Sequence, residues 1–155
     1  MGDRSNIVIE QAGERIWLYG HWMGAKSIGH AAHGLRSDRV HDAPYLARIV
    51  FSSMIRGNID SDLNYGISTR MVDNQHPIIV LDVGRTTTSV RLEDSDGKQI
   101  SRTLTPEEFL ELAAASSWDE CDPFDLHCDH DAHDWPFAPF LPQTPESEAA
   151  GEVGA

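Results

Sequence analysis

The sequence has little cysteine and no long apolar run. Only Cys121 and Cys128 occur among its 155 residues, too few for a disulfide scaffold and typical of a reducing compartment. No stretch approaches the roughly 18 to 20 apolar residues that cross a bilayer. The polar start MGDRSN does not resemble a secretory signal peptide either. We therefore expect a cytoplasmic protein that has no membrane partner.

The sequence also lacks the common catalytic motifs. It contains no GxSxG, GxGxxG or P-loop pattern, which argues against serine hydrolases, dinucleotide enzymes and P-loop NTPases. Asp60, Asp62 and Asn64 imitate the first half of a calcium loop, but Tyr65 and Met71 stand where glycine and glutamate are required. Whether the protein is an enzyme stays open, and the pattern favours a protein without catalysis.

Lysine and arginine are absent from the last part of the chain. The net charge is −13, and residues 119–155 carry 10 acidic residues and no Lys or Arg. The rest of the chain lacks the basic surface that nucleic acid requires, so we expect no direct nucleic-acid binding. The pattern indicates an α+β domain over 1–116 and an acidic tail over 117–155, disordered from 142 onward. The tail either keeps the protein soluble or imitates nucleic acid toward a basic partner.

Hydrophobic periodicity and turn residues predict six strands and three helices. Together, these elements indicate a two-layer α+β fold, with a mainly antiparallel sheet of five or six strands and two or three helices on one face. The predicted strands are 6–10, 15–22, 66–72, 77–83, 88–94 and 98–104, and the predicted helices are 25–35, 43–56 and a segment from Thr105 onward.

The predicted helices differ in how strongly the sequence favours them. The segment 43–56 has an apolar stripe at helical spacing and is expected to be the main core helix. Thr105 and Glu108 form a capping box at the start of the last helix. Two glycines weaken the helix predicted over 25–35, because glycine lowers helix propensity by up to about 1 kcal/mol relative to alanine.

Aromatic and polar residues gather at the ends of two predicted strands. If the strands 15–22 and 66–72 are antiparallel neighbours, the end of one lies beside the start of the other. Rings with a few hydrogen-bonding groups can stack on and orient a nucleotide-like ligand, although Trp and Tyr on strands more often serve sheet packing. A basic side chain, Arg48 or Arg70, would meet a phosphate. The predicted ligand-binding residues are Tyr19, His21, Trp22, Arg48, Tyr65 and Ser68.

The tail also contains a group of potential metal ligands. Thiolate and imidazole together suit zinc, but the spacing of the two cysteines matches no common zinc knuckle. The alternative is a polar tail with incidental metal affinity. Zinc is therefore the one cofactor considered, and its candidate ligands are Cys121, His127, Cys128, His130 and His133.

A second histidine pair lies in the body of the protein. His30 and His33 are one helical turn apart, near His21 and His41 in the sequence, and could supply half of a metal site. The pair lacks the glutamate of the HExxH metalloprotease motif. A metal-dependent hydrolase or a metal-binding protein is the resulting alternative, and solvated histidines are the simpler interpretation.

Five short motifs stand out in the sequence: MGDRSNIVIE, IWLYGHWMG, DAPYLARIVFSSMI, YGIST and DNQHPIIVLDV. Together they resemble a family of small uncharacterised proteins of actinobacteria and the phages that infect them. The resemblance covers roughly residues 1–83 and implies a phage-encoded accessory protein. Such a protein would bind a nucleotide-like ligand or block a host protein as a counter-defence factor, and it could form a homo-oligomer.

Overall fold

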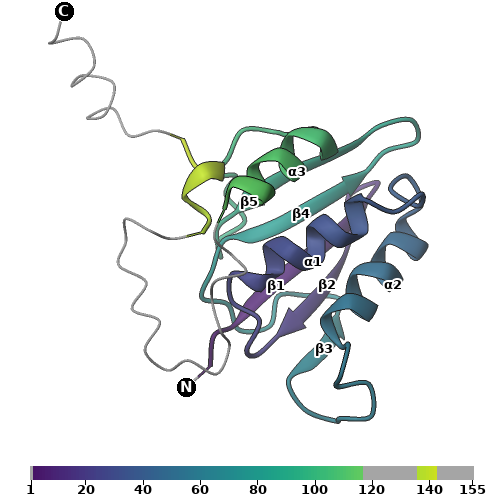
Figure 1. Ribbon diagram of the computed structural model, residues 1–155, viewed down its shortest axis with the longest axis vertical. Coiled ribbons are helices and arrows are strands. Elements are labelled where there is room, and N and C mark those ends of the chain that lie inside the picture. Colours follow the sequence, from purple (N-terminus) through teal and green to yellow (C-terminus); the bar gives the residue numbers. More distant parts are fainter. Residues whose placement is uncertain (1, 117–135, 143–155) are drawn as a thin grey trace, which may run out of the picture.

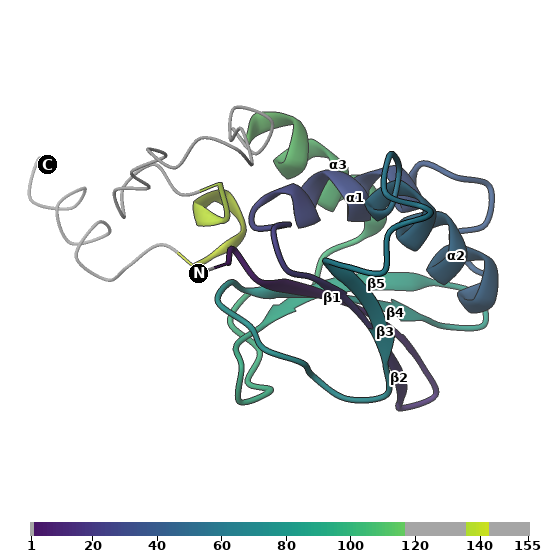
Figure 2. The same cartoon turned by 90° about the horizontal axis from the view of Figure 1, so that it is seen from below.

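A computed structural model describes residues 2–116 and 136–142 of the chain as one sheet with helices packed on it (Figure 1). Seen along the sheet, all three α-helices lie on one face (Figure 2). Within the described residues, no helix is long and apolar enough to cross a membrane. The elements are β1 (Ser5–Gln11), β2 (Glu14–Gly20), α1 (Lys26–Leu35), α2 (Ala43–Met54), β3 (Tyr65–Ser68), β4 (Ile78–Val83), β5 (Thr88–Glu93), α3 (Pro106–Ala115) and the short 3-10 helix η2 (Ala138–Phe140).

The five strands lie in the order β3-β2-β1-β4-β5. Neighbours are antiparallel except for β1 and β4, which are parallel because the chain crosses the sheet between β3 and β4. This return segment lies on the face that the helices leave open, where the backbone N–H of Gln75 donates to the carbonyl of Arg4 over 2.9 Å. The predicted two-layer, mainly antiparallel α+β fold is confirmed.

The core lies between the sheet and the helices. Side chains alternate along each strand, so Ile7 and Ile9 of β1 face the helices whereas Val8 faces the opposite side. Val8 packs there with Ile78 and Val80, under the partly buried Trp17 and Met71 of β2 and the return segment. Because both faces of β1 and β4 are covered, these strands are apolar on both sides, as expected for the inside of a sheet.

The strand predicted over 98–104 is the one element that the structure does not show as a strand. Only two isolated bridges form along β5, at Glu93–Gln99 and Val90–Leu104. Between them the Ser101 hydroxyl takes the place of a backbone carbonyl and accepts the N–H of Leu92 over 2.8 Å. A side chain thus interrupts the ladder, and the segment follows β5 without forming a regular strand.

The helix α1 forms despite its glycines because of how closely it packs on α2. A Cβ atom at Gly34 would lie 2.4 Å from the Val50 Cγ2 atom, nearer than two non-bonded carbons approach. Glycine at this position therefore lets the two helices come together, and tertiary packing outweighs the low propensity of the segment.

The last helix and a piece of the predicted tail close the end of the core. Thr105 and Glu108 form both hydrogen bonds of the capping box on α3, as predicted. Phe137, which precedes η2, and Phe140, its last residue, are buried, and the rings of Phe140 and Phe109 lie 5.0 Å apart. Residues 136–142 therefore pack on the α+β domain and contribute two rings to its core.

Candidate functional site

The predicted meeting of two strand ends is present. Gly20 at the end of β2 pairs with Tyr65 at the start of β3. The Tyr19 hydroxyl lies 3.1 Å from His21 Nδ1, and the ring of His21 meets the ring of Trp22 edge-on at 5.1 Å. Tyr19 and His21 are half-buried, and Trp22 is 38% exposed. These three rings therefore form one cluster that is open to solvent on one side.

The other predicted ligand residues do not join this ring cluster. Tyr65 turns to the helix side and packs against the core, where burial raises its pKa. Ser68 pairs with Trp17 and so lies on the same face of the sheet as Tyr19, where its hydroxyl accepts the N–H of Arg70. Arg48 is exposed on α2, outside the buried stripe of that helix, and Arg70 is exposed beyond the end of β3. The structure thus brings together three of the six residues.

The HxxH pair does not converge on one site. The ring of His30 is largely buried, and its Nδ1 atom lies 2.8 Å from the Ser53 hydroxyl of α2. Burial, followed by the positive charges of Lys26, His33 and Arg56, lowers the pKa of His30 to about 4. His33 is exposed on the neighbouring turn. His30 is therefore neutral at physiological pH and joins α1 to α2.

No metal site is visible in the part of the chain that the structure describes. Among residues 2–116 and 136–142, no three His, Cys, Asp or Glu side chains are grouped closely enough to hold an ion. The Nδ1 atom of His41 instead lies 3.1 Å from the Thr88 hydroxyl. The five metal ligands predicted in the tail, Cys121, His127, Cys128, His130 and His133, fall outside the described residues.

The outer edge of β3 is the end of the sheet (Figure 1). The N–H of His21 donates to the carbonyl of Asn64 over 2.7 Å. Hydrogen-bonded pairs alternate along an antiparallel ladder, so Gly66 and Ser68 also bond to β2. Tyr65 and Ile67 then aim their N–H and C=O groups away from β2. Within the described residues, no strand pairs with these outward groups.

Large apolar side chains are exposed around this edge. Ile67 of β3 is 62% exposed, and Ile59 and Leu63, in the loop that leads into β3, are 76% and 65% exposed. Trp22 adds its ring from the turn after β2, whose backbone is bonded to the end of this loop. We call the outward backbone of β3 together with these four side chains the β3 edge surface. Grouped exposed apolar residues of this kind mark interaction sites.

The open face of the sheet carries a network of ion pairs that the sequence analysis did not identify. Arg15 donates to Glu93 over 2.7 and 2.8 Å and also to Glu10, while Arg91 bonds to Glu10, Glu93 and Asp82. Burial raises the pKa of Glu93, but the hydrogen bond and charge of Arg15, with those of Arg91, outweigh burial and hold it below its usual value. Opposite charges on the strands β1, β2, β4 and β5 were the available signal.

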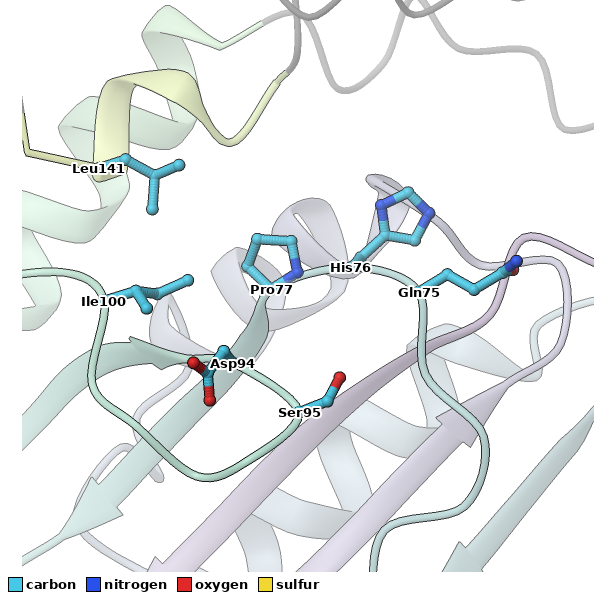
Figure 3. A pocket seen from close by; sticks show the side chains of 7 residues that line it. All are labelled: Gln75, His76, Pro77, Asp94, Ser95, Ile100 and Leu141. Atoms are coloured by element: carbon cyan, nitrogen blue, oxygen red, sulfur yellow. The ribbon is translucent and has the colours of Figure 1, made fainter. Parts of the chain in front are cut away.

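A cavity of about 250 Å³ opens at the end of the sheet where β4 begins and β5 ends (Figure 3). The side chains of Leu141, Ile100 and Pro77 gather on one side. Beside them lie Asp94 and Ser95 of the hairpin turn that follows β5, residues 94–98, which we call the β5 turn. The sequence carries no signal for this cavity, because Leu141 is distant along the chain from the lining residues around β4 and β5. It reaches them only through the packing of η2. The lining residues are Gln75, His76, Pro77, Asp94, Ser95, Ile100 and Leu141.

Comparison with known protein families, with curated proteins and with solved structures finds no match to this chain. The residues and their geometry are therefore the basis for the functional proposal.

Proposed function

We propose that this chain is a non-enzymatic binding protein that accepts an extended segment of another protein along the outer edge of β3. The observation that carries the proposal is the outward N–H and C=O groups of Tyr65 and Ile67, at an edge that no strand of residues 2–116 or 136–142 pairs with. Such an edge is a template for one further strand, and proteins use it to recognise extended peptides. In the phage context that the resemblance implies, the occupant would be a host protein that this binding blocks.

The side chains of the β3 edge surface indicate an apolar partner. Ile67, Leu63 and Ile59 each expose more than half of their surface, so a strand that is added here would bury apolar area as well as form backbone hydrogen bonds. Backbone bonds supply affinity without sequence preference, whereas apolar contacts select alternate side chains of the incoming strand.

Charge favours a basic partner over a second copy of this chain. The exposed Asp60 and Asp62 lie in the loop that leads into β3, and residues 57–64 contain no Lys or Arg. The whole chain has a net charge of −13. Two copies would repel each other, while a positively charged segment would be attracted and would associate faster at low ionic strength.

A nucleotide-like ligand at the aromatic cluster has less support from the geometry. The rings of Tyr19, His21 and Trp22 are together, but Arg48, which would meet a phosphate, is exposed on α2. The edge of β3 and the rings lie close enough for one partner to contact both, since the backbone of His21 is bonded to the residue that precedes β3.

Selection from a displayed library of unstructured peptides, followed by calorimetry with a selected peptide, tests the proposal. Ile67→Pro removes one outward N–H and leaves the bonds to β2 in place, since proline is tolerated at a strand edge that faces solvent. We expect this variant to lose at least tenfold in affinity. Ile67→Thr keeps the N–H group and removes apolar area, so its loss is expected to be smaller.

Val72→Thr is the matched control, because Val72 is another exposed β-branched residue and lies outside β3. It is expected to bind like the original protein. A thermal melt of each variant confirms that the fold is kept. A library that yields no binder, or a folded Ile67→Pro protein with undiminished affinity, would contradict the proposal.

A further inference from the structure

We propose that the cavity beside the β5 turn is a binding site for an alkylammonium group, carried either by a small primary amine or by a lysine side chain. The inference is independent of the β3 edge. It depends on three properties of the cavity: an apolar wall, a fixed carboxylate and the absence of lysine and arginine from its lining.

The apolar wall comes from three separate parts of the chain. Pro77 precedes β4 and is buried, Ile100 lies in the segment after the β5 turn, and Leu141 follows η2. Figure 3 shows the side chains of Ile100 and Leu141 directed toward the same space as Pro77. The volume of about 250 Å³ lies below the roughly 300 to 1,000 Å³ of sites for drug-sized molecules, so the occupant is small.

The carboxylate of Asp94 is held in a defined position. Its Oδ1 atom accepts the backbone N–H groups of Asp96 and Lys98, each over 2.9 Å. These two bonds belong to the hairpin turn and leave Oδ2 without a hydrogen bond from the described residues. The hydroxyl of Ser95, the next residue along the chain, accepts a hydrogen bond from the Asn74 side chain over 3.1 Å and retains a second lone pair.

An ammonium group matches this arrangement. One of its three donors can bond to the Asp94 carboxylate, while its alkyl chain lies along Pro77, Ile100 and Leu141. An anion would be repelled by the Asp94 carboxylate. A neutral alcohol would make the apolar contacts but would lack the attraction between opposite charges. The net charge of −13 also raises the local concentration of cations around the protein.

Titration of the full chain with n-butylamine, n-butanol and butyrate, followed by amide NMR shifts, tests the site. We expect shifts at the cavity residues, with the amine binding at least tenfold more tightly than the alcohol and butyrate not binding. A titration with a blocked lysine, Nα-acetyl-lysine N-methylamide, distinguishes the two sources. Tighter binding of the blocked lysine points to a partner side chain, and tighter binding of the free amine points to a metabolite.

Asp94→Asn is the decisive variant. Asparagine keeps an Oδ1 acceptor for the two turn N–H groups and removes only the charge, so the fold is expected to persist. The preference for amine over alcohol should fall to less than threefold. Leu141→Ala should weaken both ligands together. Equal affinity for amine and alcohol, an unaltered amine affinity in folded Asp94→Asn, or shifts spread over the acidic surface would each overturn the proposal.

Discussion

The two edges of the sheet are treated differently by the chain. Along β5, Val90 exchanges two backbone hydrogen bonds with Leu104 over 2.9 and 2.7 Å, and the carbonyl of Leu92 accepts from Ile100 over 2.9 Å. Along β3, the outward groups of Tyr65 and Ile67 have no such partner among the described residues. An unpaired edge invites association with other chains, so proteins usually cover it. One edge is covered here, and the part of the chain that the structure describes leaves the other open beside exposed apolar residues.

The covered edge belongs to the core, whereas the open edge belongs to the surface. Leu104 is 2% exposed and packs under α3, whereas Ile67 is 62% exposed. The two edges should therefore respond in opposite ways to substitution. Changes along β5 should alter the stability of the fold, and changes along β3 should alter what the protein binds.

The largest effect is expected for Leu104→Ala. This substitution leaves a cavity under the segment that covers β5, and buried Leu→Ala changes cost about 2–5 kcal/mol. Urea unfolding followed by circular dichroism measures the loss. Ile67→Ala is the control on the other edge. A smaller loss for Leu104→Ala than for Ile67→Ala would show that our distinction between the edges is wrong.

A smaller effect is expected for Glu93→Gln near the covered edge. Glu93 is buried and accepts from both Arg15 and Arg91, so removing its charge should cost about 2 kcal/mol at pH 7. The exposed Glu14 of β2 provides the control, since Glu14→Gln breaks no ion pair of this network. Chemical unfolding at several pH values measures both variants.

The pH dependence follows from the lowered pKa of Glu93. The unfolded state binds the proton more tightly than the folded state, so the stability that Glu93 contributes is present above its usual pKa of 4.5 and is lost as the pH falls below it. Glu93→Gln should therefore lose stability less steeply in that range. If the free energy of unfolding fell equally steeply below pH 4.5 in the original protein and in Glu93→Gln, the role given to Glu93 would be refuted.

His30 also lowers the stability of the fold as the pH falls. Its pKa in the folded protein is about 4, below its usual 6.5, so protonation favours the unfolded state between these two values.

The smallest effect on stability is expected for Ile67→Thr at the open edge. The residue is exposed and threonine suits a strand, so the free energy of unfolding should change by no more than about 0.5 kcal/mol. Hydrogen exchange provides a second measurement, in which the outward amides of Tyr65 and Ile67 should exchange faster than those of Val90 and Leu104. Slow exchange at Ile67 would indicate that this edge is already covered.

Local features of the fold were predictable, and long-range features were not. The capping box at Thr105 follows from a few adjacent residues, and the structure confirms it. The segment 98–104 has the composition of a strand, but the bond from Leu92 to Ser101 interrupts its ladder. Such a competition between a side chain and a carbonyl depends on register, which composition does not reveal.

The candidate sites show the same limit. The rings of Tyr19, His21 and Trp22 are adjacent in the sequence, and their grouping was predictable. Arg48 and Tyr65 were placed with them from chemistry alone, but Arg48 lies on α2 and Tyr65 packs against the core.

By itself, the sequence determined the α+β class, the capping box of α3, the apolar pattern of the strands and the acidity of the chain, because these depend on neighbouring residues and composition. Only the tertiary structure decided which sheet edge is covered, which ion pairs cross the open face, and that Leu141 and Asp94 line one cavity. These features join residues that are distant along the chain, and their contacts arise only when the strands are ordered and the helices are packed.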